Sequence, residues 1–467
     1  MTLTRTLVRF ATHLAITDVP QAMLHKLQLH MLDAIGCGWA ASRTTMAQRA
    51  RSAALALGGT GPCLVFGDAR GHTPAAAAFA NAFIINALDH DDGVEIEGKG
   101  LGHPGATLMA AAMAAMDQQP HSIDRADVLA ALAAGFEVNN RLIHALQPSA
   151  ERFAQVYGVA QHQAIGAAVV YGRLCRFDEP TMHKAIGLAA TLTCVPSLHK
   201  YNWQDRPIAS LKDAVAPAAQ AGVQAAIMAR LGFEGSRDVL DGPQGYWRMV
   251  GSDRFAPEIL VDGLGIHWYI GYGSFKRYPA CRWLACALEC IDTIMQDTGW
   301  TPGEIARIEV HAPARLADDF MDYAPDNPTD AQFSLPYTLA AAAMGLTRGA
   351  AWYEVEYLHS PRLRELAAKV QVAVDPMLDE RMRGADRQPG ARVIVFNLAG
   401  IRVEQTLFVP LGGALRPMHE EEIVEKARIN LTGHVRDPEG VIAGILQIAK
   451  PGDTYAGAKD VVREFLL

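Results

Sequence analysis

The first 265 residues of this chain are dominated by helical segments that are rich in alanine and apolar on nearly all faces. Apolar residues recur with a spacing near 3.6 residues, and glycine and proline separate the segments. A helix that is apolar all round must be buried, and small side chains let neighbouring helices approach closely. We therefore predict a compact domain of many helices, with the clearest segments at 23–40, 106–116, 128–137, 165–174 and 218–231.

The pattern changes after the glycine-rich segment 262–273. A helical stretch at 283–295 is followed by short runs rich in β-branched residues, which predict strands. These runs lie at 305–312, 369–375, 391–400 and 401–409. Ala399-Gly400 predicts a hairpin turn between the last two. Helical segments between the strands, such as 336–344, indicate an α+β arrangement.

Helical character returns after residues 409–417 and is clearest at 420–430. A mixed insert flanked by helical sequence predicts a mainly α fold with an inserted α+β domain. The expected division is a large all-helical domain at 1–265, a smaller α+β lid domain at 266–410, and C-terminal helices at 411–467 that return to the helical domain. The glycine-rich crossings near Gly271 and Gly412 are hinge candidates.

Composition limits the partners of the chain. Half of its 467 residues are hydrophobic and 20% are charged, which is typical of a globular protein and excludes a disordered one. Its formal net charge of −8 argues against a nucleic-acid binder, because contacts to a phosphate backbone need a basic surface. The overall field would also repel an anionic substrate, so such a substrate needs a local cluster of cations.

Neither a membrane segment nor an export signal is expected. Charged residues such as Arg5 and Asp18 interrupt the N-terminal stretch, which lacks the apolar core of a signal peptide. The apolar run 106–116 is about half the length needed to span a bilayer. The seven cysteines form no CxxC pair, and Cys286 and Cys290 indicate a buried helix face. We therefore expect a soluble cytoplasmic protein, because unpatterned cysteines suit a reducing compartment.

The densest polar cluster is NALDHDDG at 86–93, followed by LGHPG with His103. Three carboxylates and a histidine in consecutive positions after an apolar helix predict a functional site, and Asp89 and Asp92 would share a helix face. The alternative is a solvated helix end with a capping aspartate. A metal site is a third interpretation. The spacing of these residues matches no standard ligand pattern, so no metal is predicted.

Further candidates precede apolar helices or lie beside the expected hinge. His162, Lys212 and Tyr337 stand near helix starts. Taken singly, each has another interpretation: His162 as a core or capping histidine, Lys212 as a solvated lysine and Tyr337 as a core tyrosine. A cation at the start of a buried helix nevertheless suits carboxylate binding, because the free N–H groups of the helix assist. Lys276 and Arg282 belong to a basic cluster, whose alternative is a solubilising patch between domains.

Six segments follow one another along the chain: LDAIGCGWAAS, AAAFANAFIINALDHDDG, LGHPG, GVQAAIMARLGFEG, K-x-Y-P-A-C and QFSLPYTLAAAAMG. In this order they resemble the MmgE/PrpD family, which contains 2-methylcitrate dehydratases, cis-aconitate decarboxylases and iminodisuccinate epimerases. The first three resemble the family's opening helix, its segment ending in HALDFDD and its HP turn. Each motif alone is modestly specific, and their order along most of the chain carries the assignment.

The resemblance implies an active site made of Asp89, His103, His162, Lys212, Lys276 and Tyr337. It also implies a helical domain with an α+β lid, a homodimer, and no metal or organic cofactor. The two lysines would offset charge that develops on a substrate carboxylate, and a histidine would transfer a proton. In this interpretation Asp89 orients or tunes His103, and Tyr337 donates a hydrogen bond or a proton.

Several positions depart from the family motifs around the expected pocket. Asn86 and His90 stand where histidine and phenylalanine are common, and Gly93 replaces a residue that usually carries a hydroxyl group. The loop VEIEGKGLG that precedes His103 is longer than usual and brings Lys99. With Arg282, this lysine predicts a differently shaped or additional acidic group on the substrate.

We therefore expect a cofactor-independent lyase that dehydrates a small hydroxy-polycarboxylate such as 2-methylcitrate, by proton abstraction next to a carboxylate. The alternatives are a cis-aconitate-type decarboxylase or a small-dicarboxylate epimerase, because the same groups can lose carbon dioxide or invert a stereocentre. A third alternative is a non-catalytic carboxylate-binding protein. The departures at Asn86 and Gly93 motivate it, together with Gln163, which stands where many members of the family have proline.

Overall fold

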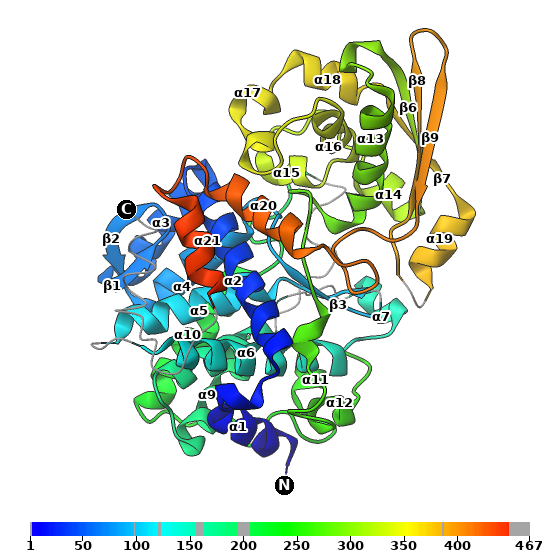
Figure 1. Ribbon diagram of the computed structural model, residues 1–467. Helices are drawn as coiled ribbons and strands as arrows, with labels where there is room; N and C mark the ends of the chain where they lie inside the picture. The colour runs from blue at the N-terminus through cyan, green and yellow to red at the C-terminus, as the bar shows by residue number, and fades with distance from the viewer. Residues whose placement is uncertain are drawn as a thin grey trace.

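The computed structural model describes residues 2–97, 99–119, 123–155, 160, 162–193, 206–384 and 387–447, and the features below belong to these residues. Helices dominate the fold, and Figure 1 shows two regions of unequal size. The larger region holds the N-terminal helices. The smaller region, at the upper right of the view, holds a four-stranded sheet with helices beside it. The predicted mainly α fold with a smaller α+β part is confirmed.

The larger region is built from helices. They are α1 (Leu3–His13), α2 (Gln21–Ala41), α3 (Thr45–Gly58), α4 (Pro74–Asn86), α5 (Pro104–Gln118), α6 (Arg125–Ala145), α7 (Ala150–Gln155), α8 (Gln163–Leu174), α9 (Glu179–Leu192), α10 (Val215–Arg230), α11 (Tyr246–Met249) and α12 (Pro257–Val261). The five predicted segments lie within or close to α2, α5, α6, α8 and α10, of which α6 extends eight residues past the predicted end at 137. Helices α4, α5, α8 and α10 pack against one another. A Cβ added to Gly222 of α10 would lie 2.4 Å from the carbonyl oxygen of Ala164 in α8, so small residues set this spacing.

Two small sheets in this region were not predicted. Strands β1 (Thr60–Val65) and β2 (Asp68–His72) form a hairpin, and β3 (Gly93–Ile96) pairs with both β4 (Lys99–Gly100) and β5 (Gly273–Ser274). These strands are short and carry glycine and charged residues, so they lack the alternating pattern that marks a strand in sequence. The second sheet matters for the site, because it joins the segment after Asp92 to residues 273–274.

The smaller region contains the strands that the sequence predicts. Its sheet has the order β7-β6-β8-β9, with β6 and β7 parallel and the other neighbours antiparallel. The strands are β6 (Ile305–Ala312), β7 (Val370–Val374), β8 (Ala391–Asn397) and β9 (Arg402–Leu407), and the helices are α13 (Ala285–Thr298), α14 (Ala314–Asp319), α15 (Pro328–Gln332), α16 (Leu335–Ala343), α17 (Val355–Leu358), α18 (Pro361–Ala367) and α19 (Pro376–Arg383). Gly400 has a φ of 78° in the predicted hairpin turn. Cys286 and Cys290 are buried on α13, as expected.

The last described helices lie beside the larger region. Figure 1 shows α20 (Glu420–Leu431) and α21 (Pro438–Leu446), in orange and red, next to the blue helix α2. Lys426 of α20 forms a buried ion pair with Asp33 of α2, with a nitrogen–oxygen distance of 2.6 Å. The domain boundaries at residues 265 and 410, and the role of the smaller region as a lid, remain predictions.

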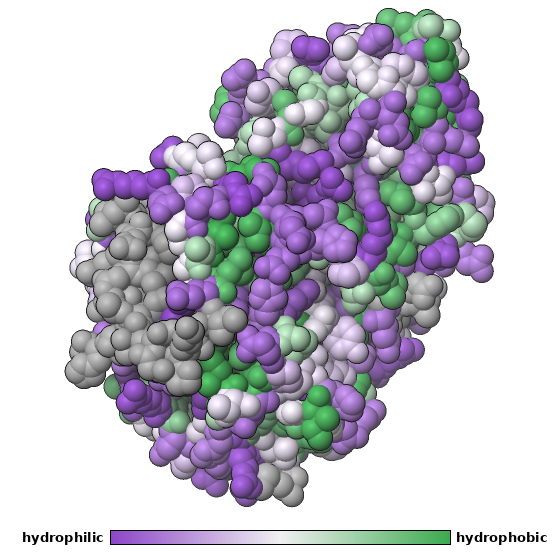
Figure 2. All heavy atoms as spheres, viewed as in Figure 1, coloured by the Kyte–Doolittle hydropathy of each residue, from purple (hydrophilic) through white to green (hydrophobic). Residues whose placement is uncertain are grey.

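The visible surface is largely hydrophilic, with small hydrophobic patches scattered over both regions (Figure 2). Hydrophilic side chains also cover the surface where the two regions meet in this view. None of the described helices is both long enough and apolar enough to cross a membrane.

Candidate active site

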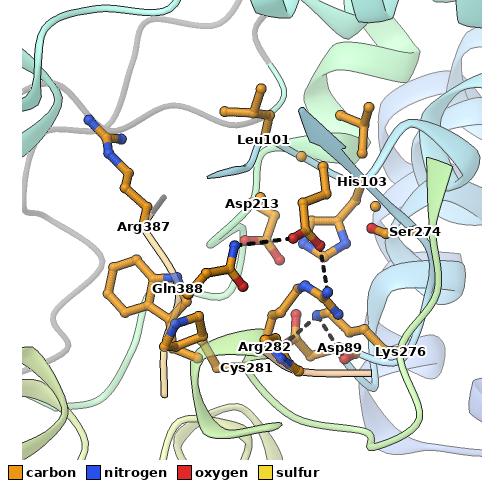
Figure 3. Close-up of a pocket in the computed structure, with 18 of the residues that line it drawn as sticks. Asp89, Leu101, His103, Asp213, Ser274, Lys276, Cys281, Arg282, Arg387 and Gln388 are labelled. Carbon is orange, nitrogen blue, oxygen red and sulfur yellow. Dashed lines mark hydrogen bonds and ion pairs between the residues drawn. The ribbon is translucent and has the colours of Figure 1, made fainter. Parts of the chain in front are cut away.

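A pocket lies where the β3–β4 hairpin, the segment around β5 and the start of the smaller region meet (Figure 3). It is lined by Asp89, Gly93, Val94, Glu95, Gly100, Leu101, Gly102, His103, Asp213, Ser274, Lys276, Cys281, Arg282, Trp283, Phe333, Arg387, Gln388, Pro389 and Pro410. The sequence-predicted residues Asp89, His103, Lys276 and Arg282 all face this pocket. They come from separate segments, so the fold brings them together.

Asp89 is the centre of a buried charge cluster. It follows α4 in a left-handed conformation, with φ of 50°. Its carboxylate lies 2.9 Å from Nζ of Lys212 and 3.0 Å from Nζ of Lys276, which also donates to the main-chain oxygen of Asp89 at 3.0 Å. Burial alone would raise the pKa of Asp89, but Lys212 and Lys276 hold it well below its ordinary value. Asp89 is therefore ionised at neutral pH.

Lys212 is held by two carboxylates. It precedes α10, and its ammonium group donates to both Asp213 and Asp89. Burial opposes the charged form, but Asp213 and Asp89 raise the pKa of Lys212 above its ordinary value. The lysine therefore stays charged although only 4% of its surface is exposed. Lys212 is not among the residues that line the pocket, but both of its carboxylate partners are, so its charge lies directly behind them.

His103 is fixed through one ring nitrogen. It is the N-terminal cap residue of α5, and its Nδ1 lies 2.8 Å from the main-chain oxygen of Asp92 and 3.5 Å from the carboxylate of Asp91. Asn86 donates to the same Asp91 carboxylate at 3.0 Å. Burial lowers the pKa of His103, but Asp91 more than offsets this, and the pKa lies above its ordinary value. Asp91 and Asp92 hold the ring, which corrects the expectation that Asp89 orients it.

Asp92, whose main-chain oxygen contacts the ring of His103, is buried and is not among the residues that line the pocket. Its carboxyl group accepts from the N–H of Gly105 at the start of α5 and lies 2.5 Å from Nδ1 of the buried His30. Burial, followed by the charge of Asp91, raises the pKa of Asp92 to about 8. Asp92 is therefore protonated at neutral pH, in contrast to Asp89 and Asp91.

A second ion pair, between Arg282 and Glu95, also lines the pocket. Arg282 forms an ion pair with Glu95 of β3 at 2.5 Å, and Gln388 donates to Glu95 at 3.5 Å. Arg282 also donates to the main-chain oxygen of Leu411 at 3.3 Å. Figure 3 shows the side chains of Arg282 and Gln388 both reaching into the pocket. The predicted residue Arg282 is thus engaged by a carboxylate of the β3–β4 hairpin.

His162 stands next to the site but is not among the described residues that line the pocket. It precedes α8, its ring packs edge-on against Tyr246, and burial lowers its pKa to about 3. Gln163, one residue later, contacts the main chain of His103 at 3.1 and 3.2 Å in the amide orientation that pairs both groups. A proton-transfer role for His162 remains a prediction.

Tyr337 and Lys99 also differ from the other predicted residues. The hydroxyl of Tyr337 donates to the main-chain oxygen of Trp352, and the ring stacks on Tyr353, so within the described structure it serves the core of the smaller region. Lys99 forms β4 through its main chain, which pairs with Ile96. The side chain of Lys99 lies outside the described residues, and its predicted effect on substrate choice remains untested.

Sequence reasoning missed several residues of the site. Asp213 follows Lys212 directly, and this charged pair before an apolar helix was an available signal. Asp91 was noted in the acidic cluster without a role. Gln388 and Arg387 carried no signal, because only the fold brings the segment before β8 to the pocket.

One group of pocket residues has the donors of a metal site. Asp89, His103 and Asp213 each place one potential ligand atom within 4.8 Å of the others. However, Lys212 already contacts both carboxylates, and Lys276 contacts Asp89. A divalent ion would have to approach these ammonium groups or displace them, so this donor set is poorly suited to a metal.

Comparisons with known proteins agree with the sequence motifs. A model of the MmgE/PrpD N-terminal domain matches residues 5–258, and a model of the MmgE/PrpD C-terminal domain matches residues 278–447. The cis-aconitate decarboxylase of Aspergillus terreus is 25% identical over 460 residues, which cover 94% of this chain and 91% of that protein. The human cis-aconitate decarboxylase is 23% identical over 378 residues, covering 76% and 72%, and the mouse enzyme is 20% identical over 438 residues, covering 89% and 84%.

Proposed function

Because the chain belongs to the MmgE/PrpD family, we propose that it is a lyase that decarboxylates an unsaturated polycarboxylate of the cis-aconitate type. Several curated relatives named cis-aconitate decarboxylase match most of the chain, which favours this reaction over the dehydration of 2-methylcitrate. The same pocket would bind the substrate through its buried cations.

The reaction needs an acid more than a base. One carboxylate leaves as carbon dioxide, and its bonding electron pair delocalises through the neighbouring double bond toward another carboxylate. A proton then adds to the carbon next to that carboxylate, so each turnover consumes one proton and releases one carbon dioxide. Cations at the remaining carboxylates stabilise the charge that develops before protonation.

The observation that carries the proposal is the position of His103, which lines the pocket together with Lys276 and has the buried carboxylate of Asp91 3.5 Å from its ring. Against the effect of burial, Asp91 raises the pKa of His103 and so favours the protonated ring, which can donate a proton to the carbanion. Lys276 faces the same pocket, and Lys212 contacts two of its lining carboxylates. A dehydratase has to remove a proton first, and it needs an unprotonated base at that step. A site that favours the protonated ring of His103 therefore suits decarboxylation better.

Purified protein incubated separately with cis-aconitate, 2-methylcitrate and iminodisuccinate provides the test. We expect cis-aconitate to give one equivalent of carbon dioxide and one new product. NMR in deuterated water follows the reaction, and the product should carry one deuterium. Water loss from 2-methylcitrate without carbon dioxide release would replace this proposal with dehydration. Racemisation of iminodisuccinate without loss of mass would replace it with epimerisation. Binding without any turnover would support the non-catalytic alternative.

Independence from metals and organic cofactors is part of the proposal. The lysines and His103 supply the charge and the proton that the reaction requires, so we expect turnover to survive dialysis against a chelator. Activity that disappears with the chelator and returns with a divalent ion would contradict this expectation. A homodimeric state, which the family resemblance implies, is tested by sedimentation at several protein concentrations.

A further inference from the structure

The pocket has a second buried ion pair that the proposed chemistry does not use. Glu95 and Arg282 join at 2.5 Å, and their side chains are 2% and 15% exposed. Both residues line the pocket. A buried arginine at a substrate pocket is a binding group for a carboxylate, because its planar fork matches the two oxygens. Here the protein itself already supplies that carboxylate.

The pair is tightly confined by the main chain. Glu95 lies on β3, whereas Arg282 begins the short helix Arg282–Leu284, so the two come from opposite walls. A Cβ added to Gly413 would lie 1.8 Å from a carboxylate oxygen of Glu95 and 2.5 Å from a guanidinium nitrogen of Arg282. The segment after β9 therefore passes directly over the pair. The main chain at Gly413 thus closes one side of the pair, and both side chains also line the pocket.

The two lysines of the site, Lys212 and Lys276, are paired with carboxylates in a different way from Arg282. Lys212 and Lys276 share Asp89, and Asp213 also contacts Lys212, so this end holds two ammonium groups near two carboxylates. The ring of His103 lies 3.5 Å from a third carboxylate, that of Asp91, which is not a lining residue. An anionic ligand at this end therefore meets Lys276 and His103 at the pocket surface, with the charge of Asp91 behind the ring. At the Glu95 end it meets a pair that is neutral overall.

We infer that Glu95 sets the number of carboxylates that the pocket accepts, by competing with the substrate for Arg282. This inference rests on the proposed function and names its specificity determinant. Two substrate carboxylates are bound near Lys212, Lys276 and His103. A third carboxylate binds Arg282 only when it displaces Glu95, so Glu95 reduces the preference for tricarboxylates over dicarboxylates.

The experiment compares two saturated acids that differ by one carboxylate, propane-1,2,3-tricarboxylate and glutarate. Binding of each acid is measured by calorimetry, because neither requires turnover. Glu95→Gln is expected to strengthen binding of the tricarboxylate about tenfold and to leave glutarate unchanged, since removing a competing charge frees Arg282. Glu95→Asp, which keeps the charge on a shorter side chain, is expected to give a smaller shift in the same direction.

Three controls sharpen the test. Arg282→Gln should remove the difference between the acids, and adding Glu95→Gln to it should change nothing further. Glu97→Gln removes the same charge from the same hairpin, but Glu97 is exposed and does not line the pocket, so both acids should bind as before. Arg387→Gln tests the neighbouring pocket arginine, which lies over the ring of Phe153.

Several outcomes would overturn the inference. An equal change for both acids, or a lower melting temperature without a change in their ratio, would mean that the pair only ties the walls together. Loss of the tricarboxylate preference in Arg387→Gln, with Arg282→Gln unaffected, would assign the third carboxylate to Arg387. A shifted ratio without carbon dioxide release from cis-aconitate would contradict only the proposed function. Turnover of cis-aconitate with an unchanged ratio would contradict only this inference.

Discussion

Two buried clusters of acids and cations lie close together in this protein, and they differ in electrostatic state. The pocket cluster consists of Asp89, Asp213, Lys212 and Lys276. The wall cluster consists of Asp33, Asp92, His30 and Lys426. Both join segments far apart in the chain, and both are almost fully buried.

The carboxyl groups of the two clusters titrate in opposite directions. In the pocket cluster, the two lysines lower the pKa of Asp89. In the wall cluster, burial outweighs Lys426 and raises the pKa of Asp33 to about 6, and that of Asp92 to about 8. Burial and pairing therefore do not by themselves mark a functional site. The pocket cluster differs in that each of its carboxylates has a lysine partner, and in that Asp89, Asp213 and Lys276 line a pocket.

The largest expected effect concerns His103, which connects the two clusters. His103→Asn is expected to lower kcat about 10²–10⁴-fold, the usual contribution of a positioned acid or base. Carbon dioxide release from cis-aconitate measures it, with circular dichroism to check folding. The rate of the unmodified protein should also fall as pH rises through the raised pKa of His103. Near-normal turnover in a folded variant would remove His103 from the mechanism, and His162→Ala tests the other predicted histidine in the same assay.

A large loss of stability is expected from the wall cluster. Lys426→Met leaves Asp33 buried without its partner, which should lower the free energy of unfolding by about 3–5 kcal/mol. Urea denaturation measures the change. Arg428→Met, on the same helix, breaks only exposed pairs and should change stability far less. Equal losses of unfolding free energy in the two variants would show that the buried Asp33–Lys426 pair stabilises the protein no more than the exposed pairs of Arg428.

Replacing a lysine of the pocket cluster with methionine should instead weaken the binding of a polycarboxylate ligand. Lys212→Met removes a desolvated cation, so binding of propane-1,2,3-tricarboxylate should weaken by about 2 kcal/mol or more, roughly 30-fold in Kd. Calorimetry measures this, and Lys184→Met, which breaks an ion pair with the exposed Glu234, is the control. Unchanged binding after Lys212→Met would mean that this lysine stabilises Asp89 and Asp213 but does not serve the ligand.

Periodicity predicted the long helices and the main sheet, because buried alanine-rich helices and β-branched strands leave a local pattern. It missed β3, although this strand carries Glu95 into the pocket. The pairing of Glu95 with Arg282 spans 187 positions, and no local pattern encodes such a contact.

The site was predicted mainly through ordered family motifs, and chemistry then gave each residue a role. The structure brings Lys212 and Lys276 together at Asp89, and their binding of a substrate carboxylate stays a prediction. Sequence reasoning failed for the partner of His103, because Asp89, Asp91 and Asp92 are equivalent in sequence. Backbone geometry decides among them: Asp89 adopts a left-handed conformation and faces the lysines, whereas the main-chain oxygen of Asp92 reaches the His103 ring.

The smallest expected effect separates these neighbouring aspartates by pH. Asp92 has a folded-state pKa of about 8, whereas an unfolded aspartate titrates near about 3.9. Between these values the folded protein holds a proton that the unfolded chain has lost. The stabilisation from Asp92 is therefore fully present below the unfolded pKa and is lost as pH rises through about 8. Asp92→Asn removes this dependence.

The free energy of unfolding of Asp92→Asn, relative to the unmodified protein, should consequently increase from pH 6 to about pH 8 and level off above it. Urea titrations at several pH values measure the difference. Asp91→Asn is the matched control: the pKa of Asp91 is lowered, largely by His103 against the effect of burial, so Asp91 is ionised in both states above pH 6. Above pH 6, titration of Asp91 itself should therefore not change the difference in unfolding free energy between Asp91→Asn and the unmodified protein. Parallel stability curves for the unmodified protein and Asp92→Asn would show that Asp92 is ionised in the folded state, and the contrast between wall and pocket clusters would then be lost at this residue.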